Sequence, residues 1–418
     1  MSMNTPDWIK RGVSKLRSVS QDIALETLRA IIDPRVSEVE GGRRAKEVAA
    51  WYAKASQEQR RDCWLLMSEQ FMADPSKAKA AQEKYALAVG TPEEAVAQVR
   101  LRQSTVSPRR KLLQRFSVFP QGIRFLVDLR ADILPALKAD KRLQALDVEM
   151  EYMFSTWFDV GFLELQRISW DSPASMLEKL IQYEAVHDIK SWADLKNRLD
   201  SDRRCYGFFH PRLPFEPLIF VEVALLDSMA TSITPLLDES AAAADLIKAS
   251  TAIFYSISNT QSGLKGISFG DSLIKRVVET LKEEFPRLKT FATLSPIPGF
   301  RAWLQHAQPE LAAQAALVDV LALNEKASLR KALHSQAAQY LGRQWHEGKP
   351  LDAVARFHLG NGAKIEQINW AGDSSGKGIK QSYGLMVNYL YDLKKLDKHR
   401  DMLASGVIPL SAEVEKLV

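Results

Sequence analysis

Apolar residues recur three and four positions apart through the first third of the chain, from Asp22 to about Leu143. This spacing gathers them on one face of a helix, so it predicts a series of amphipathic helices. We expect breaks at Asp74-Pro75, at Gly90-Thr91-Pro92, where Thr91 has the features of an N-cap, and at residues 119–122. No fixed-period repeat indicates a solenoid.

After about Phe154 the pattern changes to β-branched and aromatic runs bounded by turn residues, which predict strands. Five such runs cover residues 203–211, 217–226, 250–259, 288–297 and 363–370. Helical patterns separate them at residues 172–186, 271–285 and 299–355. The expected fold class is α+β, with an all-α domain over residues 1–155 and a mixed α/β domain over residues 156–418.

Composition and charge narrow the possible functions. The net charge of +5 is a small difference between 56 basic and 51 acidic residues, which does not indicate a nucleic-acid-binding protein but is compatible with a polyanionic small molecule such as coenzyme A. The two cysteines, Cys63 and Cys205, exclude a disulfide framework and lack metal-ligand spacing. Neither a membrane span nor a secretory signal is present, so we expect a cytoplasmic protein. Because no metal-ligand spacing occurs, we expect no metal.

Four segments carry residues that could do chemistry. The first, HPRLPFEPLIFVEVALL, places Glu216 and Glu222 in or beside an apolar strand, where a glutamate is more often ion-paired than catalytic. The second runs from a strand through a loop with Gly263, Gly266 and Gly270 into a helix. Such a loop can hold a phosphate with its backbone N–H groups, but an ordinary strand-to-helix connection has the same pattern.

The third segment, LKTFATLSPIPGFRAWL, ends a strand at Ser295, and two prolines then fix the backbone. Ser295 is either a turn serine or a site residue, and no GxSxG elbow surrounds it. The fourth segment places His358 before the turn Gly360-Asn361-Gly362. An imidazole there can act as a general acid, although histidines beside turns are also often surface residues.

Taken together, HPRLPFEPLIFVEVAL, FYSISNTQSGLKG, LSPIPGF, FHLGNGAKIEQINW and GLMVNYLY resemble the malonyl-CoA decarboxylase family in order and spacing. The resemblance implies an N-terminal helical oligomerisation domain and a C-terminal GNAT-type acetyltransferase-like domain that binds coenzyme A. It also implies decarboxylation of malonyl-CoA to acetyl-CoA and CO2 without a prosthetic group, in a homo-oligomer that is a dimer or a tetramer, with no nucleic-acid or membrane partner.

The resemblance also implies roles for individual residues. Ser295 and His358 correspond to the central pair, with Ser256 in the FYSIS strand and Tyr391 in the NYLY segment as further catalytic residues. Asn361 is a candidate for contact with the thioester oxygen. The CoA-contacting stretch is the following: Lys265, Gly266, Ile267, Ser268, Phe269, Gly270 and Asp271.

This chain departs from the family pattern at two points. Animal relatives carry a glutamate at the position of Ser268, so no carboxylate base can be assigned there. The acetyltransferase pyrophosphate loop Q/R-x-x-G-x-G/A is matched by residues 261–266 only with one glycine displaced.

Decarboxylation of a malonyl thioester requires a group that stabilises the enolate of acetyl-CoA and a proton donor to carbon. It also requires an apolar wall that favours loss of the carboxylate charge. His358 suits the proton donor, and Ser295 can orient the carboxylate or relay a proton. Two alternatives remain open at this point: a GNAT-type acyltransferase that uses acyl-CoA, and an interaction protein that only senses CoA.

Overall fold

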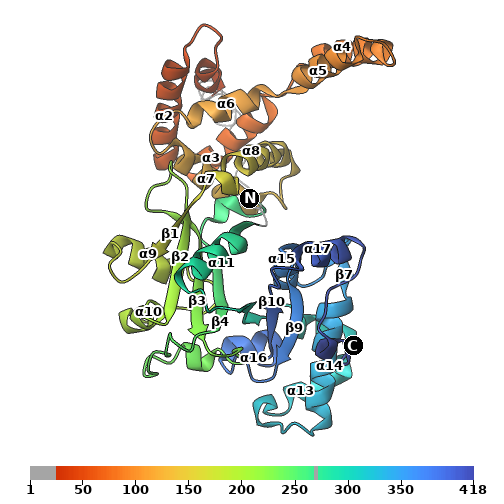
Figure 1. Ribbon diagram of the computed structural model, residues 1–418. Coiled ribbons are helices and arrows are strands. Elements are labelled where there is room, and N and C mark those ends of the chain that lie inside the picture. The colour runs from red at the N-terminus through yellow and green to blue at the C-terminus, as the bar shows by residue number, and fades with distance from the viewer. Residues whose placement is uncertain (1–24, 268–271) are drawn as a thin grey trace, which may run out of the picture. The chain divides into compact units, whose positions relative to one another are not determined.

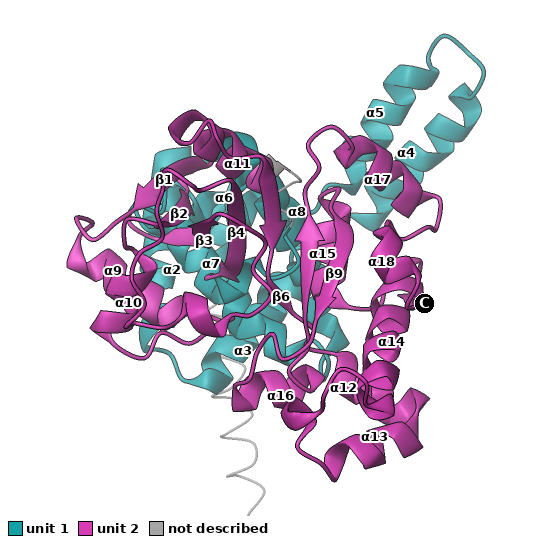
Figure 2. Ribbon diagram, turned by 60° about the horizontal axis from the view of Figure 1, so that its bottom comes forward, with its two compact units in different colours: residues 1–162, 211–214, 261–268 teal, residues 163–210, 215–260, 269–418 magenta. Residues whose placement is uncertain are grey.

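The computed structural model describes residues 25–267 and 272–418. The chain divides into two compact units, which Figure 2 shows in different colours. The helical unit consists of residues 1–162, 211–214 and 261–268, and the mixed unit of residues 163–210, 215–260 and 269–418. Helices precede a region of mixed sheet and helix, which confirms the predicted α+β class.

The helical unit is built from amphipathic helices whose apolar sides form its core. Leu112, Leu113, Phe116, Leu129 and Ile133 are fully buried there. The helices are α2 (Glu38–Lys54), α3 (Gln57–Glu69), α4 (Pro75–Ala88), α5 (Glu94–Thr105), α6 (Pro108–Phe116), α7 (Gly122–Ile133) and α8 (Gln144–Trp157).

All three expected helix breaks are confirmed, because α4 ends at Ala88 and α5 begins at Glu94, but the N-cap predicted at the second break is not. Helix α4 begins at Pro75 with Asp74 as N-cap, and α7 begins at Gly122. The prediction that Thr91 caps the next helix was wrong, because α5 begins only at Glu94. The Thr91 hydroxyl instead accepts the backbone N–H of Glu93 at 3.3 Å and closes a turn before the helix.

Helices α4 and α5 form a hairpin that extends away from the other helices of its unit (Figure 1). Neither helix has a buried residue. Leu87, Val89, Val96 and Val99 of the hairpin are between 42% and 84% exposed. An apolar surface of this kind on an extended hairpin is typical of a protein–protein contact.

The mixed unit contains a sheet in the order β1-β2-β3-β4-β5-β10-β6, with β9 paired to the other edge of β10. The pairs are antiparallel except β4 with β5. The strands are β1 (Glu164–Ile168), β2 (Arg203–Phe209), β3 (Pro217–Leu226), β4 (Thr251–Asn259), β5 (Thr290–Thr293), β6 (Ser295–Pro296), β9 (Lys364–Asn369) and β10 (Met386–Leu390), with a separate hairpin of β7 (Trp345–His346) and β8 (Lys349–Pro350).

Helices cover both faces of the sheet (Figure 1). On one face, Leu177, Leu180 and Leu195 from α9 and α10 pack against Cys205 and Phe220. On the other face, α11 lies over the strands and its Glu284 accepts the Tyr206 hydroxyl at 3.4 Å. The helices of this unit are α9 (Ala174–Tyr183), α10 (Trp192–Arg198), α11 (Ser272–Glu284), α12 (Phe300–Ala307), α13 (Pro309–Ala316), α14 (Ser328–Arg343), α15 (Ala353–Gly360), α16 (Gly376–Ser382), α17 (Leu396–Ala404) and α18 (Ala412–Glu415).

All five predicted strands are present, but the fourth differs in detail. Pairing stops at Leu294 and resumes over Ser295-Pro296, so the strand does not end at Ser295 as expected. Pro296 pairs with Met386 of β10, which is possible because this short segment lies at the edge of the sheet path. His358 precedes the turn as expected, but the helix before it extends further than the predicted end at Ala355, because α15 continues to Gly360.

Candidate active site

Ser295 is held between the end of one strand and a rigid loop. Its backbone pairs with Val387 of β10, and Pro296 and Pro298 restrict the backbone that follows. The Ser295 hydroxyl donates to Thr293 Oγ1 at 2.9 Å and lies 3.3 Å from His358 Nε2. The side chain is 5% exposed, so this hydroxyl is almost withdrawn from bulk water.

His358 lies in the last turn of α15 and is fixed on both ring nitrogens. Nε2 faces Ser295, and Nδ1 lies 2.7 Å from the hydroxyl of Tyr391. The imidazole also stacks on the ring of Tyr389, with centroids 4.6 Å apart and an interplanar angle of 26°. Contacts on both edges and one face leave the ring a single orientation.

Burial determines the protonation state of this group. It lowers the pKa of His358 to about 3, because the surroundings disfavour the imidazolium ion. Burial likewise raises the pKa of the Tyr391 hydroxyl far above its usual value. At neutral pH the series Thr293, Ser295, His358 and Tyr391 is therefore an uncharged chain of hydrogen-bonding groups.

A cavity of about 90 Å³ adjoins this chain of groups within the mixed unit. Tyr391 and Asn361 form part of its wall, and Lys275 and Arg400 bring positive charge to it. Asn361 follows the last residue of α15, and its side-chain amide donates to Phe357 O at 2.8 Å. A cavity with two cations and a few fixed polar groups is suited to an anionic ligand.

Ser256 does not join the other predicted catalytic residues. Strand β4 contains one extra residue, because Glu222 pairs with Ser256 while Val223 pairs with Phe254. This bulge turns Ser256 toward the face of the sheet that α9 and α10 cover. Phe254 faces the opposite side, where its ring packs edge-on against that of Tyr391 with centroids 6.4 Å apart. The Ser256 hydroxyl instead donates to the Glu184 carboxylate at 2.8 Å.

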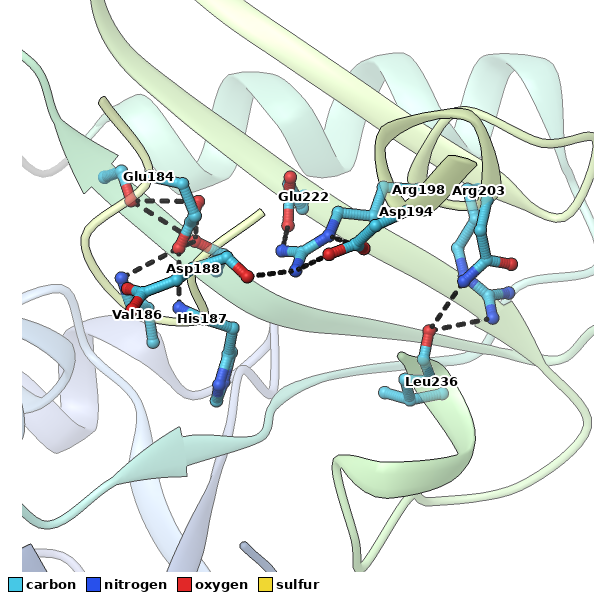
Figure 3. Close-up of polar contacts among 12 residues, drawn as sticks. Glu184, Val186, His187, Asp188, Asp194, Arg198, Arg203, Glu222 and Leu236 are labelled. Atoms are coloured by element: carbon cyan, nitrogen blue, oxygen red, sulfur yellow. Dashed lines mark hydrogen bonds and ion pairs between the residues drawn. The ribbon is translucent and has the colours of Figure 1, made fainter. Parts of the chain in front are cut away.

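The Glu184 carboxylate lies near a buried ion network of Arg198, Asp194 and Glu222 on that face (Figure 3). Arg198 contacts Asp194 at 2.8 Å and Glu222 at 3.1 Å, and neither Arg198 nor Glu222 has more than 1% exposure. Burial, reinforced by the charge of Glu184, raises the pKa of Glu222 to about 8. Glu216 is paired with Lys179 at 2.6 Å, so both glutamates of the apolar strand segment have structural partners.

Only part of the predicted CoA-contacting stretch can be described. Lys265, Gly266 and Ile267 belong to the helical unit, whereas Ser268, Phe269, Gly270 and Asp271 lie outside the described residues. The grouping of this stretch with the site therefore stays a prediction.

Gly263, just before this stretch, serves helix packing rather than ligand approach. A Cβ there would lie 1.9 Å from Val127 O of α7. Arg130 of the same helix donates to the carbonyl groups of Gly263 and Lys265, each at 2.9 Å. These contacts hold the loop against the helical unit.

Residues 25–267 and 272–418 contain no group of three His, Cys, Asp or Glu side chains that could hold a metal ion. Within the same ranges no helix is both long and apolar enough to cross a bilayer. Cys63 and Cys205 are buried free thiols whose pKa is raised by burial.

Three groups around the site escaped the sequence analysis. Thr293 and Tyr389 lie two residues before Ser295 and Tyr391, so the alternation of side chains along a strand could have placed them on the same face. Asp352 caps the helix that carries His358, and the order Leu-Asp-Ala-Val before an apolar run is an N-cap signal.

Comparison with known proteins adds independent information. A family model described as the malonyl-CoA decarboxylase C-terminal domain matches residues 161–418, and one described as the N-terminal domain matches residues 71–158. The mitochondrial malonyl-CoA decarboxylase of Anser anser anser is 39% identical over 327 residues, which are 69% of this chain and 65% of that protein. Its counterpart in Mus musculus is 38% identical over 360 residues, 77% of this chain and 73% of that protein.

Solved structures of malonyl-CoA decarboxylases are also similar to this chain. A malonyl-CoA decarboxylase from Rhodopseudomonas palustris superposes with a TM-score of 0.85 at 40% identity, covering 95% of this chain and 99% of that one. The corresponding protein from Agrobacterium vitis gives a TM-score of 0.86 at 38% identity, covering 94% and 99% of the two chains.

Proposed function

The chain belongs to the malonyl-CoA decarboxylase family, and we propose that it converts malonyl-CoA to acetyl-CoA and CO2 at the group formed by Ser295, His358 and Tyr391. The observation that carries this proposal is the continuous series of hydrogen bonds from Thr293 through Ser295 and His358 to Tyr391. The series is buried, uncharged and next to a cavity with cationic side chains.

The hydrogen bonds give the series a direction. Because the Ser295 hydroxyl donates to Thr293, its oxygen is free to accept from His358 Nε2. That arrangement places the imidazole proton on Nε2 and leaves Nδ1 to accept from the Tyr391 hydroxyl. A proton is thus available at Nε2, and a replacement proton is available behind it.

Decarboxylation breaks the bond between the carboxylate carbon and Cα, and the electron pair moves into the thioester as an enolate. CO2 leaves without a proton, so one proton must then be added to Cα. His358 Nε2 supplies this proton while Nδ1 takes the hydroxyl proton of Tyr391 and Tyr391 takes a proton from solvent in the adjoining cavity. Because these protons move together, both the imidazole and the Tyr391 hydroxyl stay neutral, and the sum is malonyl-CoA plus one proton giving acetyl-CoA and CO2.

The substrate must bring its carboxylate and thioester close to this group. Lys275 and Arg400 at the cavity suit the anionic parts of a CoA ester, and Asn361 is a candidate for the thioester oxygen. Burial around His358 supports the reaction, because a carboxylate in a dry site gains from losing its localised charge as CO2 departs.

Localisation, cofactor use and assembly complete the proposed function. We infer a cytoplasmic enzyme with a GNAT-type catalytic domain that uses no metal or organic prosthetic group. The exposed apolar residues of the α4–α5 hairpin support a homo-oligomer, dimer or tetramer, assembled through the helical unit. The CoA-contacting role of residues 265–271 and a catalytic role of Ser256 remain parts of the proposal without a contact that supports them.

The test incubates the purified protein with malonyl-CoA alone and follows acetyl-CoA and CO2. Both products should form in equal amounts without an acceptor, and Ser295→Ala or His358→Ala should lower kcat roughly a hundredfold to a thousandfold, the usual loss for one oriented donor. Ser68→Ala is a matched control, because it removes a buried serine hydroxyl, 2% exposed, that donates to Arg142 O in the helical unit.

Each outcome has a definite meaning. Intact malonyl-CoA after incubation would point to acyl transfer or CoA sensing, which addition of an amine acceptor would distinguish. Product formation with unchanged kcat in Ser295→Ala and His358→Ala would retain the activity and reject these residues as its centre.

A further inference from the structure

Asp352 lies behind the candidate active site and begins the helix that carries His358. The residue is 2% exposed, and its Oδ1 accepts the backbone N–H groups of Val354 and Ala355, each at 2.9 Å. His358 follows six residues later in the same short helix, α15. The direction of the imidazole therefore depends on where this helix starts and how it is rotated.

The second oxygen of the same carboxylate lies near the loop that follows Ser295. Oδ2 accepts the hydroxyl of Tyr340 at 3.2 Å, and it lies beside Gly299, where a Cβ would be 3.8 Å away. Gly299 comes four residues after Ser295, and two of the intervening residues are prolines that restrict the chain. One buried side chain thus contacts both the helix of His358 and the loop of Ser295.

Close packing fixes this junction. A Cβ on Gly299 would lie 2.3 Å from the Tyr340 hydroxyl and 3.8 Å from Asp352 Oδ2. Tyr340 is held in turn by the rings of Phe300 and Trp303, at centroid distances of 5.9 Å and 5.2 Å. The groups that meet Asp352 therefore have little room to shift relative to one another.

Capping alone does not account for an aspartate at this buried position. Over the described part of the chain, no Lys or Arg forms an ion pair with Asp352, although burying a carboxylate costs free energy. A serine would cap the helix equally well without that cost, as Ser375 does for α16. The second oxygen must contribute something that a serine cap lacks. Its partner is Tyr340, whose hydroxyl packs against Gly299.

We propose that Asp352 is a positioning residue that holds the helix of His358 and the loop of Ser295 at their reacting distance. This inference rests on the proposed function, since it concerns the pair assigned there to the decarboxylation. Asp352 acts through these two residues. It has no direct contact with either side chain among the hydrogen bonds of the described residues.

Asp352→Asn separates the two tasks of the carboxylate. Asparagine caps a helix as well as aspartate does, but its amide nitrogen cannot accept the hydrogen bond of Tyr340 that now reaches Oδ2. We expect kcat to fall about tenfold or more while KM changes little, because small displacements of reacting groups cost large factors in rate. Asp352→Ser should behave in the same way, and Tyr340→Phe should also lower kcat, because it removes the same hydrogen bond.

A matched control measures what loss of a cap does by itself. Ser375→Ala removes the N-cap of α16 in the same unit, where the serine hydroxyl accepts Gly378 N at 3.1 Å. This variant should lose thermal stability and keep kcat. If Asp352→Asn keeps the wild-type kcat, or if kcat falls in Ser375→Ala as it does in Asp352→Asn, the positioning role is rejected.

A crystal structure of Asp352→Asn makes the test independent of turnover. The distance between Ser295 Oγ and His358 Nε2, 3.3 Å here, should increase beyond hydrogen-bond reach. An unchanged distance would overturn the inference even if activity were lost. If the wild-type protein leaves malonyl-CoA intact, the proposed function fails, whereas this distance still decides whether Asp352 positions the pair.

Discussion

Replacement of His358 by glutamine should remove a specific part of the pH dependence of stability. Burial holds the pKa of His358 near 3 in the folded protein, against 6.5 for an exposed histidine. Below pH 6.5 the unfolded chain therefore binds a proton that the folded chain does not bind. The stability contributed by this neutral, buried imidazole is complete above pH 6.5 and declines as pH falls toward 3.

The magnitude follows from the two pKa values. Between pH 7 and pH 5, protonation of the unfolded state alone lowers the free energy of unfolding by about 2 kcal/mol. The folded state contributes almost nothing over this interval, because its pKa lies well below pH 5. The expected difference is therefore insensitive to the exact folded-state value.

The measurement is urea denaturation of the wild-type protein and of His358→Gln at pH 5 and pH 7. Other buried groups titrate as well: His187, with a pKa lowered to about 4, also loses stability on acidification, whereas Glu222, with a pKa raised to about 8, gains it. Both groups are present in the two proteins, so the difference between the proteins isolates His358. Equal pH dependence of the two proteins, or an imidazole titration near pH 6.5 by NMR, would refute the burial argument.

Two further substitutions test the surroundings of His358. Tyr391→Phe keeps the ring contact with Phe254 but leaves Nδ1 of the buried imidazole unpaired, which costs about 1–3 kcal/mol. We expect kcat to fall roughly tenfold to a hundredfold. An unchanged kcat in steady-state assays would exclude Tyr391 from the series. Gly299→Ala pushes a methyl group against the Tyr340 hydroxyl, which should lower the free energy of unfolding by about 1–3 kcal/mol. The melting temperature and kcat should both fall. Calorimetry that finds the wild-type transition would show that the junction can adjust.

Strand positions could be predicted from the sequence because the strands of the mixed unit are buried and bounded by turn residues. The run at residues 217–226 became β3 with nine of its ten residues buried, as its continuous apolar character indicates. Two strands of the large sheet were missed. The short strand β1 is mostly exposed and carries no apolar run, whereas β10 is buried but only five residues long. Periodicity detects burial on one face, so it fails for an exposed strand and cannot distinguish a short buried run from a helix segment.

The placement of Ser256 could not be predicted, because it depends on a bulge. One extra residue in β4 changes the face toward which Ser256 points, and register of this kind is set by pairing with β3 rather than by local sequence. Asp352 was missed for a related reason. Its second oxygen meets Gly299 and Tyr340, and contacts between distant segments leave no trace in local patterns.

The two faces of the sheet show why the reaction is assigned to the face of His358. On the face of Ser256, Arg198 is bound by Asp194 and Glu222 in a buried ion network whose charges already satisfy one another. On the other face, burial is the cause that lowers the pKa of His358, and its partners are the uncharged hydroxyls of Ser295 and Tyr391. A substrate that loses its charge as CO2 departs gains most from the second environment, where the groups that contact the imidazole are neutral hydroxyls.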